Sequence, residues 1–184
     1  MIFIHKTSIV DDNAILGKGT KVWHYSHILN GSIVGNNCII GQNVMIGPNV
    51  TIGDGCKIQN NVSIYEGVEL GNNVFCGPSC VFTNVINPRS FINRKKEFRI
   101  TKISDGATIG ANATIICGVK VGKFSMIGAG AVVTKNVNDH AIVVGNPSKQ
   151  SGWISSAGHK LNSKLICPIT KEAFYLSNNK LKKK

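Results

Sequence analysis

The chain has 184 residues, of which 42% are hydrophobic and only 16% charged, which excludes a disordered chain and a coiled coil. Its 24 Ile and 17 Val against 7 Leu argue against a mainly helical protein, because β-branched side chains lose rotamer freedom in helices. The net charge of +12 comes mostly from residues 88–102, with six basic residues and one acid, and residues 160–184, with seven Lys and one Glu. This uneven distribution argues against a uniformly basic nucleic-acid-binding surface.

The most informative feature is an apolar residue at every sixth position, from Ile4 to Phe82 and again from Ile103 to Val133. The fifth place of each hexad is almost always small or β-branched, and Gly often follows the lead residue. A period of six predicts an all-β parallel β-helix in which each hexad forms one short strand and one corner. Three hexads then close a triangular coil of 18 residues, with the lead and fifth residues facing a narrow core.

The repeat is interrupted by residues 88–102, which predict a basic loop extruded at one corner. A loop that leaves a rigid scaffold is a usual location for function. We therefore expect residues 1–150 to form the β-helix with this loop, and residues 151–184 to form a C-terminal part.

Three predictions concern the C-terminal part. Residues 151–161 (SGWISSAGHKL) are expected to form a short helix that caps the last coil, since an open solenoid end would expose core. Residues 166–176 (ICPITKEAFYL) are expected to form an extended strand or hairpin, and residues 178–184 (NNKLKKK) a disordered basic tail.

The start of the chain has no basic segment followed by a long apolar run, and no stretch approaches the length of a membrane span. We therefore expect a cytoplasmic protein whose six cysteines are reduced. Cys38, Cys56 and Cys80 occupy fifth places and are expected to be small core residues, with no catalytic or metal-binding role.

The hexad pattern resembles the left-handed β-helix of the hexapeptide-repeat acyltransferases. This resemblance implies the left-handed twist, a homotrimer with grooves between subunits, and transfer of an acyl group from coenzyme A. The segments IGAGAVVTKNV and VVGNPSK resemble the cofactor-binding end of the coenzyme A-dependent members. The implied cofactor contacts are Ala111, Ala129, Thr134, Lys135, Pro147 and Lys149.

Each of these contacts has an expected role by the same resemblance. The backbone amides of Ala111 and Ala129, one coil apart, would bind the pantetheine arm of acetyl-CoA. Thr134 and Lys135 would contact the pantetheine or the phosphates. Pro147 would shape the adenine site, and Lys149 would bind the 3′-phosphate, where a cation is favoured.

A closer resemblance runs through QNNVSIYEGVEL, CGPSCVFTNVINPRSFINRKKEFR, GATIGANATIICGV and GWISSAGHKL. These segments are similar to the N-acetyltransferases that acetylate the 3-amino group of nucleotide-linked sugars for surface polysaccharides, in particular those of the UDP-3-amino-glucuronate type. In that group the Asn of the FTN motif lies close to the sugar amine, which implies a catalytic role for Asn84. The group is thought to use no protein base, so the leaving thiolate would take the proton of the amine.

Other residues are candidates for binding the nucleotide sugar. His24 lies in a polar column with Gln42, Asn60 and Pro78, and it could bind substrate or act as a general base. Arg89 and Arg94 could bind a diphosphate or a sugar carboxylate, because the guanidinium fork matches both. Gln59 and Tyr65 are expected to line the same groove.

Three alternatives remain open from the residues alone. A γ-type carbonic anhydrase needs three converging His ligands, but His24 and His27 would fall on different sides of a corner. A non-catalytic solenoid scaffold would lack coenzyme A binding. The enzyme could also acetylate a dTDP-3-amino-3,6-dideoxyhexose or the hydroxyl of a small molecule.

Overall fold

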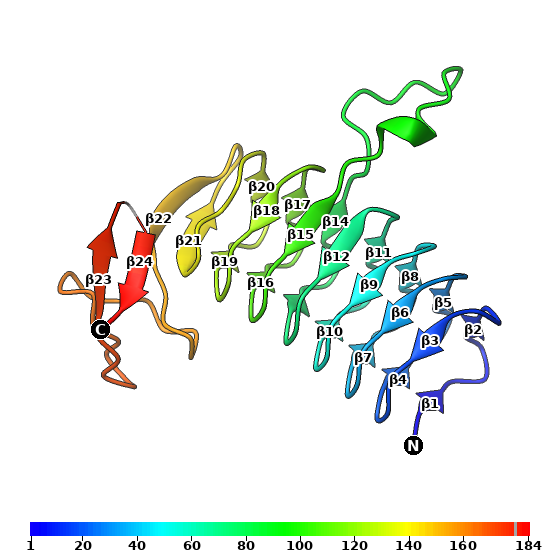
Figure 1. The fold of residues 1–184 in the computed structure, drawn as a ribbon, viewed down its shortest axis with the longest axis horizontal. Helices are drawn as coiled ribbons and strands as arrows, with labels where there is room; N and C mark the ends of the chain where they lie inside the picture. The colour runs from blue at the N-terminus through cyan, green and yellow to red at the C-terminus, as the bar shows by residue number, and fades with distance from the viewer. Residues whose placement is uncertain (179) are drawn as a thin grey trace.

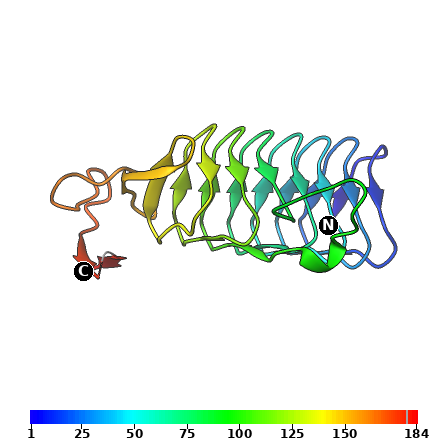
Figure 2. The same ribbon diagram turned by 90° about the horizontal axis from the view of Figure 1, so that it is seen from above.

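Each hexad forms one short strand and one corner in the computed structural model, which describes residues 1–178 and 180–184. Strands 18 residues apart pair in parallel, as Phe3 does with Lys21 and Ser63 with Val81. The strands stack into three flat sheets around a triangular core (Figures 1 and 2). The predicted parallel β-helix is confirmed, and its arrangement agrees with the left-handed form.

The three sheets and the remaining elements have the following bounds. Sheet A contains β1 (Phe3–Ile4), β4 (Lys21–Val22), β7 (Ile39–Ile40), β10 (Lys57–Ile58), β13 (Phe75–Cys76), β16 (Thr108–Ile109), β19 (Met126–Ile127), β21 (Ala141–Val144) and β22 (Lys149–Trp153). Sheet B contains β2 (Ile9–Val10), β5 (His27–Ile28), β8 (Met45–Ile46), β11 (Ser63–Ile64), β14 (Val81–Phe82), β17 (Thr114–Ile115) and β20 (Val132–Val133). Sheet C contains β3 (Ile15–Leu16), β6 (Ile33–Val34), β9 (Thr51–Ile52), β12 (Val68–Leu70), β15 (Thr101–Ile103) and β18 (Lys120–Val121). Outside the sheets lie a 3-10 turn, η1 (Lys95–Glu97), and a hairpin of β23 (Phe174–Ser177) and β24 (Lys180–Lys183).

Three kinds of corner join the sheets, and we name them by the sheets they connect. The A–B corner comprises residues 5–8, 23–26, 41–44, 59–62, 77–80, 110–113 and 128–131. The B–C corner comprises residues 11–14, 29–32, 47–50, 65–67, 83–100, 116–119 and the stretch that begins at 134. The C–A corner comprises residues 17–20, 35–38, 53–56, 71–74, 104–107 and 122–125.

The lead residues fill the core, as the repeat predicts. Those from Val22 to Val133 are almost completely buried and form one continuous cluster. Ile4, in the first coil, is 44% exposed because no coil covers it on the N-terminal side.

The fifth-place residues do more than fill space. Their hydroxyl or thiol groups donate hydrogen bonds to the carbonyl oxygen of a glycine in the next coil, as Ser26 does to Gly41 (2.7 Å) and Cys56 to Gly71 (3.0 Å). These bonds satisfy backbone carbonyls that the corner removes from the sheet ladders, and a buried carbonyl without a partner is costly.

Many corners require a left-handed residue, which explains the high Asn content. Asn43, Asn49 and Asn61 have φ angles of 54°, 58° and 61°. Asn tolerates this conformation better than other residues with a side chain, so it can replace Gly while still offering an amide for hydrogen bonding.

The extruded loop differs from the predicted range of 88–102. Strand β14 of sheet B ends at Phe82, and the next strand, β15 of sheet C, begins at Thr101. The loop therefore comprises residues 83–100. The prediction is wrong at its end because Thr101 and Lys102 pair with Val68 and Glu69 in β15. In both views the loop extends along the long axis toward the N-terminal coils (Figures 1 and 2).

The helix predicted for residues 151–161 is wrong. The chain turns back after β21, and β22 pairs with it antiparallel, so Ile142 lies opposite Gly152. A strand at this position satisfies the open edge of β21, whereas Ser and Gly are weak helix formers.

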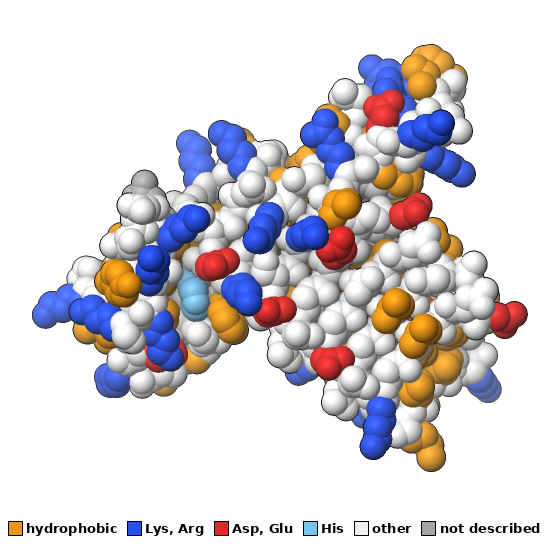
Figure 3. All heavy atoms as spheres, in the orientation of Figure 1, with side chains coloured by type: hydrophobic (Ala, Val, Ile, Leu, Met, Phe, Trp, Pro, Cys, Tyr) orange, Lys and Arg blue, Asp and Glu red, His pale blue; other side chains and the backbone are white. Residues whose placement is uncertain are grey.

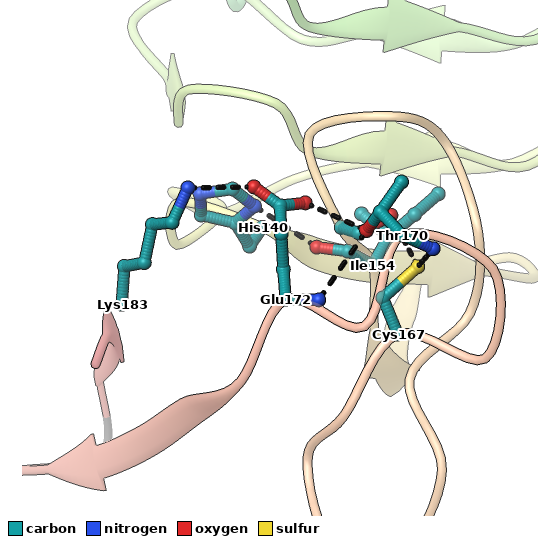
Figure 4. A network of polar contacts seen from close by, with 7 residues as sticks. His140, Ile154, Cys167, Thr170, Glu172 and Lys183 are labelled. Atoms are coloured by element: carbon teal, nitrogen blue, oxygen red, sulfur yellow. Dashed lines mark hydrogen bonds and ion pairs between the residues drawn. The ribbon is translucent and has the colours of Figure 1, made fainter.

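A separate small core follows β22, formed by Leu161, Cys167, Phe174 and Leu181. Polar contacts lie within this part and between it and the last coil (Figure 4). The ring of His140 is hydrogen-bonded through Nδ1 to the carbonyl oxygen of Ile154 (2.9 Å). Glu172 accepts hydrogen bonds from Lys183 (2.7 Å) and Thr170 (3.1 Å).

The two remaining C-terminal predictions have different outcomes. The strand or hairpin expected in residues 166–176 is confirmed by β23, which pairs with β24. The disordered tail expected for residues 178–184 is wrong, since β24 spans Lys180–Lys183; Asn179 lies outside the described residues. In the part of the chain that is described, no helix has the length and hydropathy needed to cross a membrane.

On the C–A corner, side-chain oxygens accept hydrogen bonds from backbone amides of the preceding coil. Where the acceptor is a carboxylate, this predicts that the stability of the fold decreases at low pH. Asp105 accepts a hydrogen bond from the backbone amide of Asn72 (2.9 Å) and pairs with Lys123 (3.2 Å), and both lower the pKa of its carboxyl. A folded-state pKa below the unfolded value stabilises the fold at higher pH, and this contribution is lost as pH falls through the folded-state pKa. We expect thermal unfolding between pH 5 and 2 to show a smaller loss of Tm for Asp105→Asn than for the parent. An equal loss would contradict this assignment.

Candidate active site

All of the site residues predicted from the sequence lie along the two corners that border sheet B. His24, Gln59, Ala111 and Ala129 lie on the A–B corner. Pro147 and Lys149 extend that corner at its C-terminal end, where Ser148 donates a hydrogen bond to the carbonyl of Val132 in sheet B (2.8 Å). Tyr65, Asn84, Thr134 and Lys135 lie on the B–C corner, together with the loop residues Arg89 and Arg94.

The A–B corner leaves backbone amides without acceptors in its C-terminal half. In each hexad, the third-place amide can donate to a third-place side chain one coil later, as Gln42 does to Oδ1 of Asn60 (2.8 Å). Pro78, Ala111 and Ala129 then occupy this column, and none of them offers a side-chain acceptor. Within the described chain, the amides of Ala111 and Ala129 accordingly have no hydrogen-bond partner. They are available to an extended ligand that carries carbonyl groups.

Small residues keep this part of the corner narrow. A Cβ built on Gly77 would lie 2.6 Å from the nitrogen of Ala111, and one on Gly110 would lie 2.5 Å from the nitrogen of Ala129. Only glycine permits this close stacking of coils. Because the neighbouring side chains are absent or small, the free amides of Ala111 and Ala129 remain open to a ligand.

A pocket of about 270 Å³ lies on the same corner, nearer the N-terminus. Trp23, Ile39, Gln42, Gln59 and Asn60 are among its lining residues, together with His24. The rings of Trp23 and His24 are stacked, with an interplanar angle of 10°. The pocket therefore combines aromatic faces with side-chain amides.

Asn84 lies at the start of the loop, with its side chain partly exposed on the B–C corner. Its backbone carbonyl accepts a hydrogen bond from the amide of Arg99 (2.9 Å), which closes the loop at its base. The neighbouring Thr83 accepts a hydrogen bond at Oγ1 from the amide of Cys117 (2.9 Å). These bonds fix the backbone at Asn84, and its side-chain amide makes no hydrogen bond to other described residues.

The two loop arginines differ in their availability. Arg94 forms a bidentate ion pair with Glu97, at 2.7 and 2.9 Å, and its Nε is buried without an acceptor among the described residues. Arg89 is exposed and donates only to the carbonyl of Pro88 (3.0 Å). Arg89 is therefore the freer cation, whereas Arg94 would have to exchange Glu97 for a ligand.

The histidines of the N-terminal coils do not form a metal site. His5 and His24 are stacked with their ring centroids 3.6 Å apart, and burial, followed by the charges of His24 and Lys6, lowers the pKa of His5. His27 is paired with Asp11 (2.8 Å) on the B–C corner. No group of three His, Cys, Asp or Glu side chains within the described residues could hold a metal ion.

The cysteines are free and buried, in keeping with the predicted core role. The hydrogen bond with Cys80, together with burial, raises the pKa of the Cys76 thiol. Because the thiolate is the nucleophilic form, this raised pKa does not favour catalysis by Cys76.

Comparison with known families places the chain in one of them. The model of the bacterial transferase hexapeptide (six repeats) matches residues 13–48, 49–84 and 100–135, more than half of the chain. The chain belongs to the hexapeptide-repeat bacterial transferases. The matched segments of this hexapeptide-repeat transferase stop at Asn84 and resume at Ile100, and so exclude the loop body.

Two of the relatives of this hexapeptide-repeat transferase are named as N-acetyltransferases. It is 36% identical to the dTDP-3-amino-3,6-dideoxy-alpha-D-galactopyranose 3-N-acetyltransferase of Aneurinibacillus thermoaerophilus over 83 residues, 44% of this chain and 43% of that protein. It is 42% identical to a 2,3,4,5-tetrahydropyridine-2,6-dicarboxylate N-acetyltransferase of Staphylococcus aureus over 77 residues, 42% of this chain and 29% of that protein. The alignments thus span less than half of each relative.

Solved structures share the fold. PerB from Caulobacter crescentus, in complex with CoA and GDP-perosamine, has a TM-score of 0.54 at 22% identity, covering 82% of this chain and 57% of that one. A hexapeptide-repeat-containing acetyltransferase of Vibrio cholerae, complexed with acetyl coenzyme A, has a TM-score of 0.50 at 25% identity, covering 76% and 70%.

The sequence reasoning did not single out Trp23 as a pocket residue, and it named Asn60 only as a member of the polar column of His24. Trp23 lies in the second place of its hexad, where Gly is usual, and this unusual large side chain was the available signal. Asn60 is followed one coil later by Pro78, which has no side-chain acceptor, so its backbone amide is also left without a partner in the described chain.

Proposed function

We propose that this hexapeptide-repeat transferase transfers the acetyl group of acetyl-CoA to the C3 amine of a nucleotide-linked amino sugar. The observation that carries the proposal is the line of unpaired amides at Ala111 and Ala129 on one border of sheet B, with Asn84 on the other. The free amides suit the carbonyl groups of a pantetheine arm, and the Asn84 side chain suits an amine.

The two borders of sheet B would meet in a homotrimer. The outward residues of sheet B carry no Lys, Arg, Asp or Glu; they are Ile9, His27, Met45, Ser63, Val81, Thr114 and Val132. Sheets A and C, by contrast, expose charged residues such as Lys57 and Glu69. With the uncharged sheet turned toward a three-fold axis, the A–B corner of one subunit would face the B–C corner and loop of its neighbour.

In this arrangement the amine would attack the thioester directly. The carbon–nitrogen bond forms as the carbonyl oxygen gains negative charge, which a backbone amide of the A–B corner would stabilise. The carbon–sulfur bond then breaks, and the leaving thiolate takes the proton of the amine. The uncharged amide of Asn84 would accept a hydrogen bond from the amine and orient its lone pair without favouring the ammonium form.

His24 is not well placed to be the base. It lies three coils from Asn84, about 14 Å along the axis at the usual strand spacing. We expect His24→Ala to raise the KM for the nucleotide sugar while kcat and its pH profile are retained. A large loss of kcat, measured under saturating substrate, would instead support a His base.

Lys149 is assigned to the 3′-phosphate of coenzyme A. We expect Lys149→Ala to raise the KM for acetyl-CoA about ten-fold, since hydrogen bonds to charged groups contribute about 1.5–3 kcal/mol. The KM for 3′-dephospho-acetyl-CoA should not change between the parent and the variant. An equal rise for both donors would contradict the assignment.

The acceptor that we favour is a UDP-linked 3-amino-glucuronate. Arg89 and Arg94 on the loop would supply cations for its diphosphate and carboxylate. The alternative is a dTDP-3-amino-3,6-dideoxyhexose, which the Aneurinibacillus relative favours, since its name specifies that sugar class.

A thiol-release assay with acetyl-CoA tests both acceptors. We expect release with UDP-3-amino-glucuronate above that with dTDP-3-amino-3,6-dideoxygalactose, and the reverse order would select the alternative. If no amino sugar is acetylated and calorimetry detects no binding of coenzyme A, the chain is a scaffold and the proposal fails.

A further inference from the structure

The pocket at Trp23 is not used by the reaction at Asn84. It spans the coils of β4, β7 and β10, on the N-terminal side of the coil that carries Asn84. Its polar groups and aromatic rings are therefore available for a part of the acceptor remote from the amine.

The rings of this pocket are held in place by other rings. The ring of Phe3 lies 5.3 Å from that of Trp23, centroid to centroid, and His5 is stacked on His24 at 3.6 Å. Trp23 nevertheless remains 39% exposed. A preformed, partly exposed aromatic surface is a suitable stacking partner for a nucleobase.

The lining of the pocket also includes hydrogen-bonding groups that lack partners among the described residues. The side chain of Gln59 makes no hydrogen bond to other described residues, and the backbone amide of Asn60 has none because Pro78 follows in its column. The Gln59 side chain offers an NH₂ group and a carbonyl oxygen, and the adjacent backbone amide of Asn60 adds a further N–H donor. This set complements the imide edge of uracil or thymine, in which an N–H lies between two carbonyl oxygens.

We infer that this pocket binds the uracil or thymine base of a pyrimidine nucleoside diphosphate, with Trp23 as the stacking surface. The inference rests on the proposed function for the sugar and the diphosphate, and it adds the site of the base. Along the axis, the pocket extends from about 5 to about 14 Å from the coil of Asn84, since Asn60 lies one coil away and Trp23 three, and this leaves room for the ribose and diphosphate between the amine and Trp23. The loop extends toward the same coils, and Figure 3 shows its basic side chains gathered away from the solenoid surface.

Tryptophan fluorescence tests the inference without turnover. The chain contains only Trp23 and Trp153, so Trp153→Phe makes Trp23 the sole reporter. We expect saturable quenching by UDP and dTDP, at least ten-fold weaker binding of ADP, and no response to ribose 5-phosphate. Equal binding of ADP would overturn the pyrimidine assignment, and quenching by ribose 5-phosphate alone would overturn the base site.

Calorimetry with UDP on variants of the full chain gives the second measurement. Trp23→Ala should weaken UDP binding at least ten-fold, because stacking of a base on an aromatic ring contributes about 1–3 kcal/mol. Trp23→Phe should retain most of the affinity. Tyr175→Ala removes a similarly exposed ring, at 42%, from the C-terminal hairpin and should change nothing.

The outcomes separate this inference from the proposed function. UDP binding that depends on Trp23 without acetylation of any amino sugar would refute the function and retain the base site. Acetylation with unchanged UDP affinity in Trp23→Ala would retain the function and refute the base site.

Discussion

Replacing Asn84 with Ala should lower kcat about 100-fold, while the KM for acetyl-CoA and the Tm remain close to those of the parent. The magnitude is that of removing one preorganised hydrogen-bonding group from a reacting centre. The fold should be unaffected because Asn84 contributes a backbone carbonyl, not its side chain, to the bond with Arg99 that closes the loop. Steady-state kinetics by thiol release, with circular dichroism as a check on folding, measure both quantities.

A matched control is available in the same loop. Asn87 is an exposed Asn three residues further on, and Asn87→Ala should leave kcat within two-fold of the parent. If Asn84→Ala behaves like this control, Asn84 is a corner residue only, and the reacting centre must be assigned elsewhere on the corners of sheet B.

Replacing Ile109 with Ala should destabilise the β-helix by about 2–5 kcal/mol, the usual cost of truncating a buried aliphatic side chain to Ala. Ile109 has no exposed surface and lies in β16, between β13 and β19 of sheet A. The core of a triangular coil is narrow and close-packed, so its backbone has little freedom to collapse into the cavity. Chemical denaturation would measure the change in the free energy of unfolding.

Ile33→Ala provides the comparison. Ile33 is also in a two-residue strand, β6, but occupies the outward place and is 46% exposed. Its truncation should change the free energy of unfolding by about 0.5 kcal/mol or less. Similar effects at both positions would contradict the assignment of inward and outward places along the repeat.

The solenoid was predictable from the sequence because each coil contacts only its neighbours. A residue such as Ile58 pairs with Ile40 on one side and Cys76 on the other, both 18 positions away, so the period records the packing directly. The same logic predicted that His24 shares a column with Gln42, Asn60 and Pro78, and that Ala111 and Ala129 lie one coil apart. It did not predict where the loop ends, because Thr101 enters sheet C at a place where the sequence has left the hexad pattern.

The C-terminal part was less predictable because its structure depends on contacts that no local pattern records. Phe174 and Leu181 are buried against Cys167 and Leu161, and the spacing of these four residues does not continue the hexad repeat. The expected helix was inferred from the need to cover the last coil, but an antiparallel strand meets that need equally well. The resemblance implied the free amides of Ala111 and Ala129, but the free amide of Asn60 was not foreseen, since it follows from Pro78 one coil later.

The constant rise of the coils gives this molecule a fixed unit of length. The base site and the pantetheine-binding amides are assigned to coils of the A–B corner and the amine to a coil of the B–C corner, so their separations along the axis are whole multiples of about 4.8 Å. Duplication or deletion of one 18-residue coil would change a separation by one such step without disturbing the packing of the others. Chains of this architecture can thus adapt to longer or shorter acceptors by copying coils, while the chemistry at each coil is conserved.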